Sequence, residues 1–298
     1  MNAWKRLRNP VLFNEWKMRM RTNRSPWIIF LYLLTLGGMT LLYIFLQTNG
    51  GSYYNPNQTR ELLMMLSILQ LGMIGFVVPG LTAGVISGER ERQTLSILLT
   101  TNVSATRLIL GKWLASLSFM TFLVFATIPL YAIVFLYGGI SPVQLIKVFS
   151  FYVITMFAIG SIGVLLSTLI KRTGIATVVS YALVFGFAIG SSVLAEIIRE
   201  LIRFQRRVNY ATSTPFPLWP DLLHSINPLF AMLNIFDEGP VRDLRRMNNT
   251  QFTLLNIDPF WYYCFFLGLV TVVCLLLSIY FIQPVRPRFR KADRAAEQ

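Results

Sequence analysis

Residue types that carry enzyme chemistry are scarce in this 298-residue chain. His224 is the only histidine, which excludes a His-Glu-x-x-His zinc site and a histidine-rich metal cluster. It lies near Asp221, but no Gly-x-Ser-x-Gly elbow accompanies the pair, and we interpret His224 as a loop histidine. Gly111-Lys112 is followed by Trp113 and lacks the upstream glycine of a nucleotide-binding P-loop. The sequence therefore predicts no catalytic residue and no metal site, and active transport by this chain would draw its energy from another polypeptide.

One cluster of charged side chains of both signs follows an apolar block: Glu196, Arg199, Glu200 and Arg203. Their alternation at helical spacing predicts a solvated helix face rather than a proton relay. A lipid-processing membrane enzyme would have to use this cluster, because no other polar group of this kind gathers at one leaflet.

The elements that position these residues are membrane helices. Hydrophobic residues make up 54% of the chain and charged residues 13%, against roughly 25% charged in soluble domains. The apolar residues gather in charge-free blocks, each long enough for the roughly 20 residues of a transmembrane helix. Six spans are predicted, at Trp27–Leu46, Leu62–Ile86, Trp113–Tyr137, Val148–Ile170, Ile175–Ala195 and Phe260–Ile282. None contains an ionisable residue, which argues against a proton-driven carrier.

The basic residues predict the orientation of these spans. The formal net charge is +14, and 18 of the 27 Lys and Arg residues lie in the segments 5–24, 90–112, 171–172 and 286–294. The short loops on the other side carry only Arg60 and Lys147. The positive-inside rule therefore predicts that both termini are cytoplasmic. Membrane orientation accounts for most of the positive charge, and we expect no nucleic-acid partner. This topology fits a multi-pass protein in a prokaryotic plasma membrane, surrounded by its lipids.

Two glycine pairs at a four-residue spacing, Gly80 with Gly84 and Gly186 with Gly190, would let helix backbones approach closely. We favour packing within the bundle over a dimer interface for both pairs. Pro79 and Pro129 lie inside apolar blocks and predict kinks in spans two and three, unless neighbours satisfy the freed carbonyls.

The segment 86–115 between spans two and three is the most informative part of the sequence. Charged residues at 89–92 lead into an amphipathic turn that places Leu95, Leu98 and Leu99 on one face. Ser104 can then cap a helix that runs into the membrane. A short interfacial helix of this kind can dock into a cleft of a soluble partner and pass its motion to two spans. Alternatively, it lies on lipid headgroups.

This segment resembles the loop after span two in the type-2 (exporter-like) class of ABC transporter permeases. The resemblance rests on the acidic-basic cluster, Thr-Leu, paired leucines, a Val-Ser turn and Gly-Lys, and extends more weakly over the whole chain. It implies that loop 87–112 contains a coupling helix that contacts a nucleotide-binding subunit. By position, the contact residues would be Glu89, Arg90, Glu91, Arg92, Thr94, Leu95 and Leu98. Two residues depart from the family pattern, since Gln93 stands where Gly is common and Asn102 where Pro is common.

Two further segments fit the same resemblance. Within the N-terminal segment 1–26, residues 4–24 are similar to the interfacial connecting helix of the family. Leu222–Phe236, which contains Asn227-Pro228, is similar to its short re-entrant outer helices. The predicted extracytoplasmic connection 199–259 is long for this class, and a basic tail, 283–298, ends the chain.

The resemblance implies an all-α membrane domain that pairs with itself or a similar permease to form a translocation path. Separate ATPase subunits would bind ATP and magnesium, so the chain itself would hold no cofactor. Spans two and five are expected to line the path, whose lack of buried charge suits hydrophobic or amphipathic cargo. The alternatives are a non-transporting assembly or regulatory protein that recruits a soluble partner through loop 86–115, and the lipid-processing enzyme.

Overall fold

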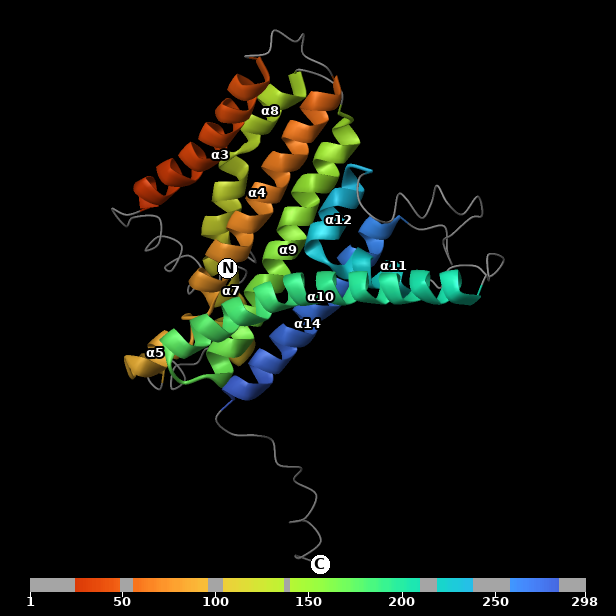
Figure 1. Cartoon of the computed structure of the whole chain (residues 1–298). Helices are drawn as coiled ribbons and strands as arrows, with labels where there is room; N and C mark the ends of the chain where they lie inside the picture. Colours follow the sequence, from red (N-terminus) through yellow and green to blue (C-terminus); the bar gives the residue numbers. More distant parts are fainter. Residues whose placement is uncertain are drawn as a thin grey trace, which may run out of the picture.

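The computed structural model describes residues 25–48, 56–95, 104–136, 140–209, 219–237 and 258–283. In these residues all regular structure is helical (Figure 1). The helices are α3 (Ser25–Thr48), α4 (Pro56–Thr82), α5 (Ser87–Glu91), α7 (Ala105–Ala126), α8 (Ile128–Leu136), α9 (Pro142–Leu169), α10 (Thr173–Asn209), α11 (Trp219–Ile226), α12 (Pro228–Ile235) and α14 (Pro259–Ile282). Within the described residues, six stretches are long and apolar enough to cross a membrane, as the sequence predicts. The predicted interfacial helix at 4–24 and the tail beyond Gln283 lie outside the described residues.

Helix α9 is central to the bundle and packs against α4, α7, α10, α12 and α14. Small residues on α9 make these close approaches possible. A Cβ added to Gly163 would lie 2.0 Å from Thr82 Oγ1 and 2.9 Å from Thr82 Cβ on α4. A Cβ added to Gly160 would lie 2.7 Å from a methyl group of Leu117 on α7. The tightest contacts of the described bundle therefore depend on two glycines that the sequence analysis did not select.

Buried polar side chains join α4, α8 and α9 and the break between α7 and α8. The hydroxyl groups of Tyr131 on α8 and Tyr152 on α9 lie 2.8 Å apart, and Tyr152 also donates to the carbonyl of Ser67 on α4 at 3.2 Å. The Gln70 amide of α4 donates to Thr127 Oγ1 at 3.2 Å. Thr127 separates α7 from α8, two residues before Pro129, so span three breaks where proline predicts.

Pro79 has a different effect from Pro129, since α4 continues past it to Thr82. The helix then gives way to a turn, and Ala83 N–H still donates to the Pro79 carbonyl at 2.9 Å. The Tyr181 hydroxyl of α10 donates to the nearby Phe76 carbonyl at 2.8 Å. The carbonyl that Pro79 leaves without a helical donor is that of Gly75, four residues earlier, so the Tyr181 bond reaches the adjacent carbonyl rather than the freed one.

Four helices extend well beyond their predicted spans, and α4 begins at Pro56 rather than Leu62 and α7 at Ala105 rather than Trp113. Helix α9 begins at Pro142 rather than Val148, because Ser141 and Gln144 form a reciprocal capping box around its first turn. Helix α10 runs on to Asn209, and in Figure 1 it crosses the bundle so that its second half lies along α11. Most of the predicted 210–259 part of the outer connection lies outside the described residues, apart from α11, α12 and their flanks.

The contact at Gly163 predicts a strong effect of one methyl group. Gly163→Ala should destabilise the protein by about 1–3 kcal/mol, because α4 must move away from α9 to admit the Cβ. We expect a lower midpoint of thermal unfolding in detergent. Gly268→Ala on α14 is the matched control, since nothing lies within 4 Å of a Cβ added there. Equal unfolding midpoints for the two variants would contradict the close α4–α9 contact.

Candidate functional site

Helix α5, which the resemblance places at the partner contact, is only five residues long and is capped by another helix. Its N-cap residue, Ile86, has no side chain that can accept a hydrogen bond. Instead, Ser167 Oγ of α9 accepts hydrogen bonds from the N–H groups of Ile86 at 2.8 Å and Ser87 at 2.9 Å. Ser167 thus satisfies two of the donors that a helix start leaves open. The first turn of α5 is attached to the end of α9.

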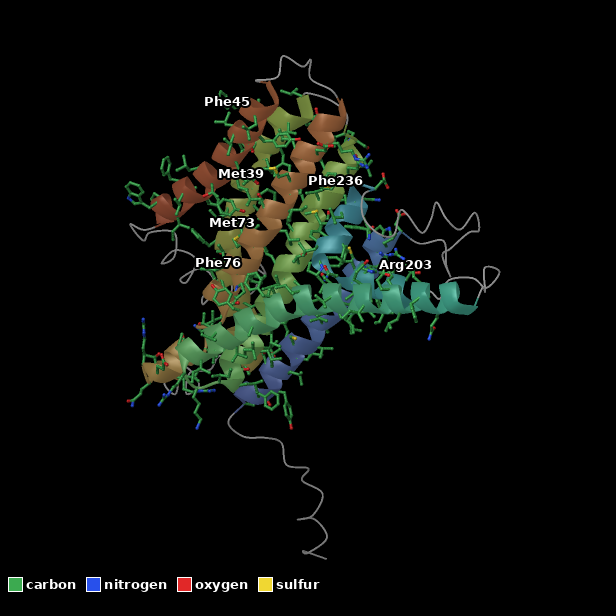
Figure 2. The ribbon with its side chains drawn as sticks, viewed as in Figure 1. Met39, Phe45, Met73, Phe76, Arg203 and Phe236 are labelled. Carbon is green, nitrogen blue, oxygen red and sulfur yellow. The ribbon has the colours of Figure 1, made fainter. Side chains whose placement is uncertain are left out.

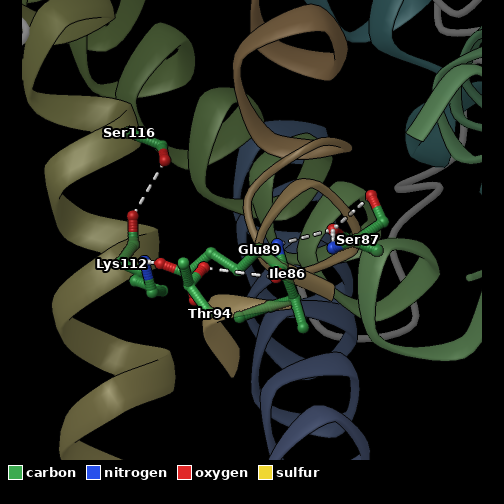
Figure 3. Close-up of polar contacts among 7 residues, drawn as sticks. Ile86, Ser87, Glu89, Thr94, Lys112 and Ser116 are labelled. Atoms are coloured by element: carbon green, nitrogen blue, oxygen red, sulfur yellow. Dashed lines mark hydrogen bonds and ion pairs between the residues drawn. The ribbon is translucent and has the colours of Figure 1, made fainter. Parts of the chain in front are cut away.

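Glu89 attaches α5 to α7. Its carboxylate forms an ion pair with the ammonium group of Lys112 on α7, and Figure 3 shows the two side chains meeting between the helices. Lys112 is only 3% exposed. Because a buried charge is stable only when it is paired, Glu89 is held at this position. The Glu89 carbonyl also accepts a hydrogen bond from Thr94 Oγ1 at 3.2 Å, which closes the turn after α5.

Arg90 and Glu91 attach α5 to α9 and α10. The Arg90 guanidinium donates to the Thr168 carbonyl at 3.1 Å, in the last turn of α9 where backbone carbonyls lack helical partners. The Glu91 carboxylate accepts hydrogen bonds from the N–H and hydroxyl groups of Thr173, both at 2.8 Å. Thr173 is the first residue of α10, so the carboxylate caps that helix and complements its dipole.

The end of α5 shows why glycine is common at one position where this chain departs from the family pattern. Gln93 follows the helix with φ of 59°, in the left-handed region where a residue with a side chain is strained by about 1–2 kcal/mol. Its N–H donates to the Arg90 carbonyl at 3.1 Å. A glycine would adopt this conformation without strain, so the position favours the residue that is common there.

The predicted contact residues separate into two groups. Glu89, Arg90 and Glu91 are engaged within the chain, and Leu95 is buried in the core. Arg92 and Thr94 are exposed. Leu98, Leu99 and Asn102 lie outside the described residues. Ser104 caps α7 as expected, accepting from Arg107 N–H at 3.4 Å.

An open groove of about 610 Å³ lies beside α5. Residues of four helices line it, among them Gly80 of α4, Glu89 of α5, Lys112 of α7 and Thr173 of α10. The lining therefore combines glycines and apolar residues of α4 and of the turn after it with the charged side chains of α5.

The two predicted glycine pairs differ in their surroundings. A Cβ on Gly80 would lie 2.9 Å from the Tyr181 hydroxyl, and one on Gly84 would lie 3.0 Å from Thr173 Cγ2, so both face α10. Within the described part of the chain, nothing lies within 4 Å of a Cβ on Gly186 or Gly190. The first pair packs inside the bundle, whereas the second pair presents an open face of α10.

The charged cluster on α10 is only partly a solvated face. Glu200 and Arg203 are exposed and pair at 2.6 Å, as predicted. Arg199, in contrast, is 2% exposed and lies 3.7 Å from Glu196. His224 is also not a loop residue, because it lies in α11 and is fully buried against the ring of Phe230. Burial and the charge of Arg199 lower the pKa of His224 to about 4, so it is neutral at neutral pH.

Asn227 explains why these groups become buried. Its carbonyl oxygen accepts from Leu229 N–H at 2.8 Å and caps α12, while its amide donates to the Ala188 carbonyl and Ser191 Oγ of α10, both at 2.7 Å. The α11–α12 pair is thereby held onto α10 and covers Arg199. In the residues that the structure describes, no group of three metal-ligating side chains forms.

The Ser167 cap predicts a local effect of removing one hydroxyl group. Ser167→Ala should leave the Ile86 and Ser87 N–H groups without their acceptor, at a cost of about 1–3 kcal/mol. Amide hydrogen exchange in a peptide covering α5 should then accelerate about tenfold or more. Ser161→Ala is the control on the same helix, because Ser161 Oγ donates to Ala158 of α9 itself. Unchanged exchange in α5 would show that Ser167 does not hold it.

The chain was compared with known proteins. The family model described as "ABC-2 family transporter protein" matches residues 10–294, which is nearly the whole chain. A search of curated proteins found no match. The matched range includes the six membrane-spanning helices and α5 with its attachments to α7, α9 and α10. The chain therefore belongs to the ABC-2 transporter family and is a multi-pass membrane protein.

Proposed function

We propose that the chain is the membrane-spanning permease subunit of an ATP-driven ABC exporter, coupled through α5 to separate ATPase subunits. The observation that carries this proposal is the attachment of one five-residue helix to three spans by Glu89, Arg90, Glu91 and Ser167. A helix that merely rested on headgroups would gain nothing from such fixation. ATP and magnesium would be bound by the partner, and this chain would contribute the path.

The attachments supply a physical route for coupling. When a partner displaces α5, the contacts act on the start of α7, the end of α9 and the start of α10 at once. The Glu89–Lys112 ion pair and the Ser167 cap involve buried side chains, so breaking either contact leaves an unsatisfied buried group. Displacing the spans together is therefore less costly than detaching α5, which makes α5 a suitable point for the partner to act on.

The open face of α10 supports pairing with a second permease copy or a similar permease. Large apolar side chains such as Phe187, Ile189 and Val193 are exposed there beside Gly186 and Gly190. We propose that α4 and α10 line the path between the two copies and that the cargo is hydrophobic or amphipathic. We also propose that α5 lies on the cytoplasmic side of a prokaryotic plasma membrane, and the distribution of basic residues supports this orientation.

Affinity purification of the tagged chain tests this proposal. The tagged wild type and an Arg92→Glu variant would be extracted in mild detergent, and co-purifying proteins would be identified by mass spectrometry and assayed for ATPase activity. We choose Arg92 because it is exposed, whereas reversing Glu89 or Glu91 would detach α5 from the bundle. The wild type should recover a P-loop ATPase. Arg92→Glu should recover about tenfold less, because the new carboxylate would repel the acidic groups of the partner that Arg92 attracts.

Arg203→Glu is the matched control. Arg203 is exposed and lies at the end of α10 remote from α5 (Figure 2), so this variant should recover as much ATPase as the wild type. Recovery of no ATPase by the wild type, even after crosslinking, would remove the energy source and favour an assembly or regulatory protein. Recovery of a soluble partner without ATPase activity would favour the same alternative.

A further inference from the structure

The turn between α9 and α10, Ile170–Arg172, is held beside α5 by contacts on both of its sides. Arg90 of α5 donates to the carbonyl of Thr168, two residues before the turn, at 3.1 Å. Glu91 accepts from Thr173, directly after the turn, at 2.8 Å. Because only three residues separate the two helices, the turn cannot move far from α5 while these bonds persist. Lys171 and Arg172 are both exposed.

The two carboxylates of this region and two of its basic side chains, Arg90 and Lys112, are engaged within the chain. The Glu89 carboxylate pairs with buried Lys112, and the Glu91 carboxylate caps α10. Four charged side chains are exposed here, the three cations of Arg92, Lys171 and Arg172 and the single carboxylate of Glu91. The combined surface of α5 and the turn is therefore positively charged. An acidic surface is the complementary partner.

The fixed spacing of these cations distinguishes a protein partner from lipid headgroups. Anionic lipids are mobile and are attracted by basic residues in any arrangement. Here the molecule accepts left-handed strain at Gln93, an interhelical cap by Ser167 and a buried ion pair to hold α5 against the turn. Such fixation serves recognition of a partner whose own charges have fixed positions.

We propose that the Ile170–Arg172 turn and α5 form one composite docking surface that binds an acidic patch on the ATPase subunit. This inference rests on the proposed function. It adds a second contact element, the turn that follows α9, to the single helix that the sequence indicated. The turn also joins the partner directly to the start of α10. The partner would then act on α10 both through Glu91 and through the turn itself.

The test is the recovery of the ATPase by a Lys171→Glu/Arg172→Glu variant of the full chain in mild detergent without added lipid. Recovery at about 0.15 M salt should fall at least about tenfold, as for Arg92→Glu. A Lys171→Gln/Arg172→Gln variant should recover an intermediate amount, and the wild-type complex should weaken as salt increases. Arg203→Glu is again the control for a reversed surface charge, and thermal unfolding confirms that each variant is folded.

The outcomes separate this inference from the proposed function. Undiminished ATPase recovery by the folded Lys171→Glu/Arg172→Glu variant, alongside recovery by the wild type, overturns the composite surface and leaves the permease role intact. A loss that is seen only in nanodiscs containing anionic lipid, and not in neutral lipid or detergent, assigns the two cations to headgroups and also overturns it. Recovery of no ATPase by the wild type rejects both proposals.

Discussion

A five-residue helix cannot satisfy its own backbone, and this constraint organises the end of the bundle where α5 lies. The N–H of Gly88 is bonded to the Gly84 carbonyl, but those of Ile86 and Ser87 need an acceptor from outside the helix, and Ile86 offers no side-chain acceptor. Ser167 of α9 supplies the acceptor, and the side chains of α5 supply the remaining links to α7, α9 and α10. The conformation of α5 is therefore a property of four helices together and cannot be changed without changing their contacts.

Close packing around α9 follows from the same arrangement. Ser167 reaches the start of α5 because α4 approaches α9 at Gly163 and ends soon afterwards, at Thr82. A larger residue at Gly163 would move α4 and carry the start of α5 away from its cap. The glycine and the serine, one helical turn apart on α9, thus serve one geometry. Neither carries charge, and both are small residues of the kind that membrane helices use to approach each other.

Sequence patterns predicted the parts of the structure that depend on neighbouring residues. Six apolar blocks predicted the spans, Ser104 predicted the start of α7, and Pro129 predicted the break in span three, since each signal is local. The ion pair of Glu89 with Lys112 and the caps formed by Glu91 and Ser167 join residues 23 to 82 positions apart, and no pattern in one sequence specifies such pairs. The predictions for Arg199 and His224 were wrong for the same reason, because the packing of α11 and α12 against α10 buries both side chains.

Helix α10 connects the two polar clusters of the structure. Glu91 caps its first residue, Thr173. Asn227 binds the middle of the helix at Ala188 and Ser191, about 22 Å further along at 1.5 Å per residue. No proline interrupts the helix between these points, so its backbone hydrogen bonds transmit axial movement with little bending. A displacement of α5 that shifts α10 therefore either moves the α11–α12 pair as well or breaks the hydrogen bonds between Asn227 and α10. Breaking these bonds would leave the Asn227 amide without its acceptors on α10. The Asn227 carbonyl oxygen caps α12, so the same side chain joins α10 to the outer helices, and we infer that the outer helices move with α10.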